Sequence, residues 1–171
     1  ELHAPHPAFA ALSAELRAAW PVLVPGVHRL EFERGRVVLT LALGDATELL
    51  PHLRLSADAI YLDGFTPSRN PDLWTPALLK RIARVAAPGA TAATWSVATD
   101  VRHALGSAGF EVEKRPGYGG KREMLVARAT RTSDATMTHG ARRALVIGAG
   151  MAGAGVCERL AARGWSLTLL E

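Results

Sequence analysis

The stretch GAGMAG, which begins at Gly148, has glycines at the spacing that binds the phosphates of a dinucleotide. Gly148 permits a tight turn, Gly150 lets the backbone approach a pyrophosphate, and Gly153 allows close packing of a helix on a strand. The helix N-terminus supplies free N–H groups and positive potential. Glu171, 21 positions after Gly150, is placed to accept hydrogen bonds from ribose hydroxyls. The sequence therefore predicts a dinucleotide site at these four residues, and the ribose of FAD or of NAD suits it equally.

Polar residues also follow three predicted strands. Asp45, Asp63 and Ser96 each stand at the carboxyl end of a strand that we expect to be parallel. In open α/β sheets, ligands lie outside the carboxyl ends of the strands. The pattern therefore predicts a shared ligand crevice.

The segment that starts at Asp63, DGFTP, resembles the NPPY/DPPY element of amino-group methyltransferases. In that element a polar side chain accepts a hydrogen bond from the target nitrogen, and an aromatic ring encloses the substrate. An alkylamine has a pKa of about 10 and arrives protonated, so a carboxylate beside it orients the nitrogen and helps to remove the proton. The resemblance makes Asp63 the catalytic candidate. Phe65 offers a stacking face for an unstacked base, and Pro67 restrains the loop beside it.

The elements that position these residues alternate between helix and strand. We expect helices at 1–21, 47–53, 72–86 and 99–108, with Asp72 as N-cap or first-turn acid of the third and Pro88-Gly89 as its end. We expect strands in 27–43, at 58–62, 90–95, 110–115 and 122–128. This order predicts an α/β fold: a mostly parallel sheet with helices on both faces and an antiparallel edge hairpin.

The chain is expected to contain parts of two domains. Residues 1–128 form the first, and 129–141, which is rich in Thr and Ser without apolar periodicity, is a linker. Residues 142–171 begin a second domain with strand 144–147, a helix to about Arg163 and strand 166–170.

Composition is that of a globular protein, with 49% hydrophobic and 21% charged residues in 171. The formal charge is +4, and residues 102–143 alone carry nine Lys/Arg against four Asp/Glu, a net of +5. This excess suits a polyanion such as RNA, and it also suits a solvated face. A single cysteine, Cys157, and the lack of a long apolar run lead us to expect a cytoplasmic protein without membrane or metal partners.

Three stretches, DGFTPSRNPDLW, GYGGKREMLVAR and VIGAGMAGAGVCERLAARG, occur in an order that resembles the bifunctional enzymes of tRNA 5-methylaminomethyl-2-thiouridine biosynthesis. The resemblance implies a class I, Rossmann-like methyltransferase that uses S-adenosylmethionine, followed by an FAD-dependent oxidoreductase. It implies that the flavin part removes the carboxymethyl group of 5-carboxymethylaminomethyl-2-thiouridine at the tRNA wobble position. The first part then methylates 5-aminomethyl-2-thiouridine.

Site residues follow from this resemblance by position. Asp63 is the acid beside methyl donor and amine, and Gly44, Asp45 and Ala46 form the loop along the donor's adenine. The FAD fingerprint is Gly148, Gly150, Gly153 and Glu171. Tyr118, Lys121 and Arg122 lie in the basic glycine-rich loop that the tRNA approaches, although Gly120 stands where the family usually has an arginine.

The chain opens at Glu1 without methionine and stops at Glu171 as a strand ends, so we expect a middle portion of a longer enzyme that is inactive by itself. Two alternatives stay open. The second domain binds NAD as a dehydrogenase, or the first is a tRNA-docking module that has lost methyl transfer.

Overall fold

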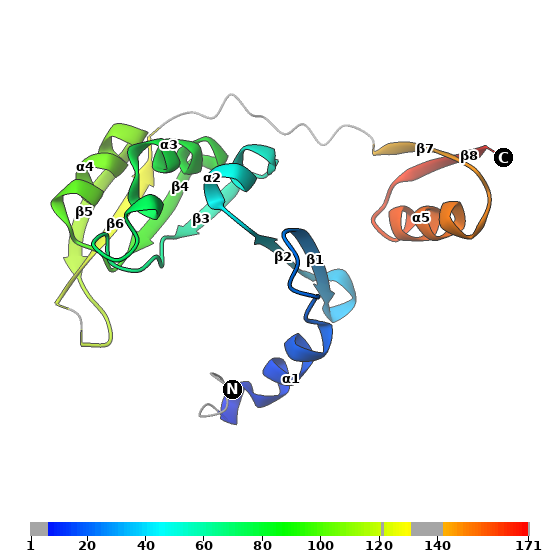
Figure 1. The fold of residues 1–171 in the computed structure, drawn as a ribbon, viewed down its shortest axis with the longest axis horizontal. Coiled ribbons are helices and arrows are strands. Elements are labelled where there is room, and N and C mark those ends of the chain that lie inside the picture. Colours follow the sequence, from blue (N-terminus) through cyan, green and yellow to red (C-terminus); the bar gives the residue numbers. More distant parts are fainter. Residues whose placement is uncertain (1–6, 121, 131–141, 171) are drawn as a thin grey trace. The chain divides into compact units, whose positions relative to one another are not determined.

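The computed structural model describes residues 7–120, 122–130 and 142–170 (Figure 1). The chain divides into two compact units, Glu1–Ser133 and Asp134–Glu171. The α-helices are α1 (Ala10–Ala19), α2 (Ala46–Leu49), α3 (Pro76–Val85), α4 (Thr99–Ala108) and α5 (Met151–Ala161). The strands are β1 (Gly26–Phe32), β2 (Val37–Leu43), β3 (Ala57–Tyr61), β4 (Ala86–Thr94), β5 (Phe110–Pro116), β6 (Glu123–Ala129), β7 (Arg143–Ile147) and β8 (Ser166–Leu170). Short 3-10 helices lie at Pro7–Phe9, Glu33–Gly35, Leu50–His52 and Pro71–Trp74.

Strands β3, β4, β6 and β5 form, in this order, the sheet that we call the main sheet. The α/β class is confirmed, and so is the edge hairpin, because β5 and β6 pair antiparallel from Phe110↔Ala129 to Pro116↔Glu123. Strands β3 and β4 are parallel, whereas β4 and β6 are antiparallel. In the described residues the main sheet is thus mixed rather than mostly parallel, because β6 turns back from β5 and inserts between it and β4.

The core of the first unit lies between the main sheet and helices α3 and α4. Leu79, Leu105, Leu125 and Val101 are the largest fully buried side chains. Helices α3 and α4 contact each other, so they cover the same face of the sheet, not opposite faces as we expected. The crossovers β3-α3-β4 and β4-α4-β5 both run in the same direction across the sheet. Right-handed crossovers that run in the same direction place their helices on the same face.

Helix α3 is shorter than the predicted helix at 72–86. Thr75, just before the helix, is extended, with ψ 142°. Its Oγ accepts a hydrogen bond from the N–H of Leu78. A residue before proline avoids the helical region, so the helix begins at Pro76 and Asp72 stays in the preceding 3-10 turn. The helix ends before Pro88-Gly89, because Ala86 is already extended and begins β4.

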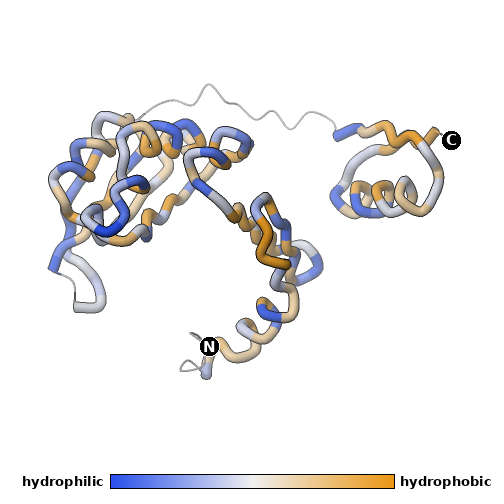
Figure 2. The backbone as a smooth tube through the Cα atoms, in the orientation of Figure 1, coloured by the Kyte–Doolittle hydropathy of each residue, from blue (hydrophilic) through white to orange (hydrophobic). Residues whose placement is uncertain are grey.

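Strand β2 pairs with β1, antiparallel, from Gly26↔Leu43 to Phe32↔Val37. Asp45 therefore follows an antiparallel strand, which corrects the expectation of a parallel one. The turn at Glu33–Gly35 is short, and a short turn can return the chain only antiparallel. Several apolar residues of this hairpin and of the segment before it are exposed: Val22, Leu23, Val24, Val27, Val37 and Val38. The hydropathy colouring in Figure 2 shows that much of this hairpin is hydrophobic in sequence.

The second unit consists of β7, α5 and β8. The strands pair in parallel from Arg143↔Ser166 to Ile147↔Leu170, with α5 as the crossover between them (Figure 1). Helix α5 ends at Ala161, two residues before the predicted end at Arg163. Most of the predicted linker, 131–141, lies outside the described residues, and Ala129 is still part of β6.

Candidate functional site

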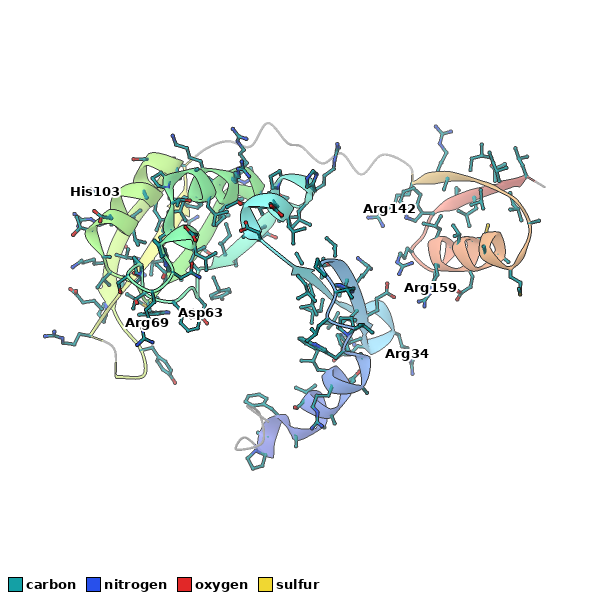
Figure 3. All side chains as sticks on the ribbon, in the orientation of Figure 1. Arg34, Asp63, Arg69, His103, Arg142 and Arg159 are labelled. Carbon is teal, nitrogen blue, oxygen red and sulfur yellow. The ribbon has the colours of Figure 1, made fainter. Side chains whose placement is uncertain are left out.

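The parallel register of β3 and β4 brings Asp63 beside Trp95. Tyr61 is paired with Ala93, and the N–H of Leu62 donates to the Ala93 carbonyl at 2.9 Å. Two residues beyond this pair in each segment, the indole Nε1–H of Trp95 donates to Oδ1 of Asp63 at 3.1 Å. Asp63 is exposed on the segment that follows β3 (Figure 3). Its carboxylate is therefore held by the neighbouring strand and open to a ligand.

The side chain of Trp74 holds the loop that follows Asp63 through a hydrogen bond. This indole is 7% exposed, and its Nε1–H donates to the carbonyl of Phe65 at 2.7 Å. A Cβ at Gly64 would lie 3.2 Å from side-chain atoms of both Leu73 and Trp74. The glycine thus lets the backbone beside Asp63 lie directly on the buried ring.

A pocket of about 320 Å³ opens on one side of Asp63. We call it the Gly44 pocket, and it is lined by Ala42, Gly44, Ala46, Leu49, Leu50, Leu53, Tyr61, Leu62, Asp63, Gly64, Leu73, Trp74, Leu78 and Ile82. Its volume and its mostly apolar wall with one carboxylate are typical of small-molecule sites. Of the loop predicted to lie along adenine, Gly44 and Ala46 line this pocket.

Gly44 shapes the pocket through its backbone. Its φ is +147°, which disfavours other residues, and a Cβ there would lie 3.0 Å from Cδ1 of Leu49. A side chain at this position would thus push on a wall of the pocket.

Asp45 has a local role instead. It is the N-cap of α2, and its Oδ1 accepts from the backbone N–H of Thr47 at 2.6 Å and from the Thr47 hydroxyl at 2.5 Å. These hydrogen bonds hold the pKa of the Asp45 carboxyl below its usual value, and the bond from the Thr47 hydroxyl has the largest effect. Helix α2 spans four residues, and Leu50–His52 continues it as a 3-10 turn where we expected one helix at 47–53.

Two further hollows adjoin Trp95, and Asp63 lines one of them. The Tyr118 hollow, about 460 Å³, is lined by Tyr61, Leu62, Asp63, Ala93, Thr94, Trp95, Tyr118 and Met124. The Arg122 hollow, about 680 Å³, is lined by Thr66, Pro67, Trp95, Ser96, Val97, Ala98, Arg122 and Glu123. The structure thus brings Tyr118, Pro67 and Arg122 to the same end of the sheet as Asp63, and Lys121 lies outside the described residues. Ser96 lines the Arg122 hollow but is itself buried.

Phe65 is placed differently from the other substrate candidates. Its ring is 70% exposed and lines none of the three cavities just described, although its carbonyl is the acceptor for Trp74. Tyr118, at 93% exposure, extends from the loop between β5 and β6. The antiparallel register puts that loop at the carboxyl end of β4, because Thr94 pairs with Leu125.

Basic side chains of the edge hairpin are partly neutralised by neighbours. Lys114 Nζ lies 3.1 Å from a carboxylate oxygen of Glu123, and an Arg115 guanidinium nitrogen lies 2.9 Å from one of Glu113. Exposed pairs of this kind contribute little stability, but they lower the charge available to a polyanion. Arg122 is exposed on the loop side of this hairpin.

The second unit has the geometry of a phosphate-binding turn. Gly148 has φ +99°, and a Cβ at Gly153 would overlap the carbonyl oxygen of Gly148. Gly150 is the N-cap of α5, and a Cβ there would meet open space. The turn therefore leaves room for a phosphate group at a helix N-terminus, which suits the predicted ligand. Glu171 lies outside the described residues.

Residues 7–130 match the protein family described as S-adenosyl-L-methionine-dependent methyltransferase. The chain belongs to this methyltransferase family. The match covers the main sheet, the Gly44 pocket and Asp63 together, so these features lie in the methyltransferase part.

Relatives of this methyltransferase carry the name that the sequence resemblance pointed to. Proteins named tRNA 5-methylaminomethyl-2-thiouridine biosynthesis bifunctional protein MnmC from Aromatoleum aromaticum and Ralstonia nicotianae are 56% and 55% identical to it. Each alignment covers 99% of this chain, which spans 27% of the relative's length. The crystal structure of MNMC2 from Aquifex aeolicus matches with a TM-score of 0.61 and 29% identity, over 75% of this chain and 39% of that one. The predicted family resemblance is confirmed.

Sequence reasoning assigned no role to the two tryptophans of this candidate site. Trp74 ends the quoted stretch DGFTPSRNPDLW, and the signal for Trp95 was its place one residue before Ser96 at a strand end. Among the residues that the structure describes, no three His, Cys, Asp or Glu are grouped to hold a metal ion. No helix in the described ranges has the length and apolar content needed to cross a membrane.

Proposed function

We propose that residues 1–128 transfer a methyl group from S-adenosylmethionine to the primary amine of 5-aminomethyl-2-thiouridine in tRNA. The observation that carries this proposal is the position of Asp63, whose carboxylate lines both the Gly44 pocket and the Tyr118 hollow. A donor in the first and an amine in the second would meet at this side chain. The names of the relatives supply the substrate class.

In this proposal the Gly44 pocket holds the donor. Gly44 and Ala46 leave space for the adenine, and the apolar wall formed by Leu49, Leu53 and Ile82 excludes water from it. S-adenosylmethionine, when bound, supplies a methyl group on a positively charged sulfur. Asp63 is the carboxylate on the wall of this pocket, and its negative charge favours a cation beside it.

Asp63 prepares the amine. At neutral pH the free amine is protonated, with a pKa of about 10, and its lone pair is not available. The carboxylate accepts a hydrogen bond from this nitrogen, orients it and takes up the proton that must leave. A donor bound in the Gly44 pocket would supply the methyl group and leave as the neutral thioether S-adenosylhomocysteine. The nitrogen would lose one proton to the Asp63 carboxylate, so that the product is a secondary amine.

The second part of the proposal concerns residues 142–171. We infer that they begin an FAD-dependent oxidoreductase that removes the carboxymethyl group of 5-carboxymethylaminomethyl-2-thiouridine. The Gly148–Gly153 turn supports it, because it presents the N-terminus of α5 with no side chain in the way. The residues 129–141 join this unit to the methyltransferase.

Asp63→Asn in the complete protein tests the methyl-transfer proposal. We expect kcat to fall by about 10²–10⁴, because the amide neither carries the charge nor accepts the proton. Flavin content should stay unchanged. The measurement is transfer of labelled methyl groups to tRNA from cells that lack this modification.

The matched control is Asp58→Asn. Asp58 is an exposed carboxylate on the same strand, β3, and it lines none of the three cavities. Activity of the Asp63 variant within threefold of wild type would remove Asp63 from the mechanism. If wild-type protein binds tRNA but transfers no methyl group, the result would support the alternative that residues 1–128 are a tRNA-docking module.

A further inference from the structure

Trp95 lies where the two strands of the parallel pair end together. Side chains alternate along a strand, so Tyr61 and Asp63 share a face with Ala93 and Trp95. All four line the Tyr118 hollow. The contact between the Trp95 indole and the Asp63 carboxylate therefore follows from the register, since a slip of one residue would turn the ring to the other face.

The same indole also lines the Arg122 hollow. Trp95 is half-buried, and it is a lining residue of both hollows. A flat aromatic wall beside a cationic side chain is the arrangement that binds an unstacked base next to a phosphate. Phe65, which we expected to stack on the base, lines neither hollow.

We infer that Trp95 is a positioning and specificity-determining residue for the proposed methyl transfer, on which this inference rests. Its Nε1–H occupies Oδ1 of Asp63 and so turns the other carboxylate oxygen to the amine. Its ring is the surface on which the modified pyrimidine lies. The two roles belong to different atoms of one side chain, so they can be separated by substitution.

Trp95→Phe removes the N–H donor and keeps a ring. We expect kcat for tRNA methylation to fall roughly 10- to 100-fold, because a misplaced catalytic group loses that much. KM for tRNA should stay within about twofold. Trp95→Leu removes the ring as well, and we expect KM to rise by about tenfold in addition, the usual effect of losing one stacked base.

Trp165→Phe is the matched control, because Trp165 is also half-buried but lies in the second unit. It should leave methylation unchanged. Benzothienylalanine at position 95 is a second test, since it keeps the bicyclic shape and lacks only the N–H donor. This variant should show the same fall in kcat as Trp95→Phe. Its thermal unfolding midpoint should equal that of the wild type.

A double-mutant cycle shows whether Trp95 acts through Asp63. In single-turnover methylation, Trp95→Phe should have no further effect in the Asp63→Asn background, because there is no carboxylate to position. An equal loss in both backgrounds would mean that Trp95 supports the fold instead, and this inference would be wrong. Wild-type kcat for Trp95→Phe would also overturn it, with the proposed function intact. A wild-type protein that transfers no methyl group would instead overturn the proposed function.

Discussion

Asp63 and Asp45 are both carboxylates that follow strands, but they have different partners. Asp63 accepts a hydrogen bond from the indole of Trp95, which directly follows β4 and is 32 positions away in sequence. Asp45 accepts from Thr47, two positions away, and caps its own helix. A long-range partner fixes a side chain relative to the whole sheet, whereas a short-range partner fixes only the local turn.

This difference predicts how substitutions at Asp45 behave. Asp45→Asn should keep the affinity for S-adenosylmethionine within about threefold, because asparagine caps helices as well as aspartate does. Asp45→Ala should weaken donor binding, because α2 and the Gly44 pocket lose their cap. Calorimetric titration of the complete protein at pH 7 measures both. Equal losses for the two variants would show that the carboxylate itself contacts the donor.

The cap also has a defined dependence on pH. Because its hydrogen bonds lower the pKa of Asp45 in the folded state, its contribution to stability is fully present above the unfolded value of 3.8. That contribution is lost as pH falls through the lower folded value. Near neutral pH it is constant, so a change in donor affinity there arises from other groups.

Asp63 could be selected as a candidate from sequence because a polar residue that follows an apolar predicted strand is visible there. Trp95 could not, because its contact depends on which residues of β3 and β4 are paired. Local sequence does not encode that register, and the pairing shifts between Ala57 and Ala59. Phe65 was expected to offer a stacking face to an unstacked base. Its carbonyl accepts from Trp74 and the residue lines neither hollow, so stacking on its ring stays a prediction.

At the scale of elements, local rules predicted helix ends where a residue imposes a backbone shape. Helix α4 spans 99–108 as expected, closed by Gly109 at φ +101°. The start of α3 was placed too early although Thr75-Pro76 carried the signal, since the residue before proline is extended. Strand order was not predictable in the same way, because the position of β6 between β4 and β5 is determined by tertiary packing and not by local sequence.

The turn of the second unit predicts different effects for substitutions at two of its glycines. Gly150→Val should abolish flavin binding but leave the unit folded, since the φ of Gly150 is −69° and a Cβ there meets no atom. Gly153→Ala should disrupt the turn itself, because the new Cβ would overlap the backbone of Gly148. The flavin-to-protein ratio of the purified complete protein and limited proteolysis distinguish the two effects.

Gly155→Ala is the control on the same helix. A Cβ at Gly155 also meets no atom, and alanine favours helix over glycine by up to about 1 kcal/mol. We expect normal flavin content in this variant. A Gly150→Val protein that remains yellow would contradict the assignment of the pyrophosphate site.

At the scale of the whole molecule, the net charge of +4 is distributed unevenly, and part of it is paired. Lys114 and Arg115 lie beside carboxylates, whereas Arg122 lines a hollow together with Trp95, the partner of Asp63. We expect Arg122→Ala to weaken binding to all tRNA sequences alike, because phosphate contacts carry no base information. The slope of log K against log salt should shrink by about 0.7–0.9.

Arg84→Ala provides the comparison. Arg84 is exposed in the last turn of α3, just before β4 begins, and so lies away from the carboxyl end of that strand. Its loss should leave the slope unchanged. Anisotropy titrations of labelled tRNA at several salt concentrations measure both variants, and an unaltered slope for Arg122→Ala would place the RNA path elsewhere.

Strand β5 stands last in the order of the main sheet, and its outer edge has no partner strand in the described residues. An unpaired edge invites sheet growth from one molecule to the next, which leads to aggregation. Here the strand carries Glu111, Glu113, Lys114 and Arg115 and ends at Pro116, and charge and proline both oppose such growth. The charged hairpin therefore disfavours strand pairing between molecules at this edge of the sheet, whatever it does for RNA.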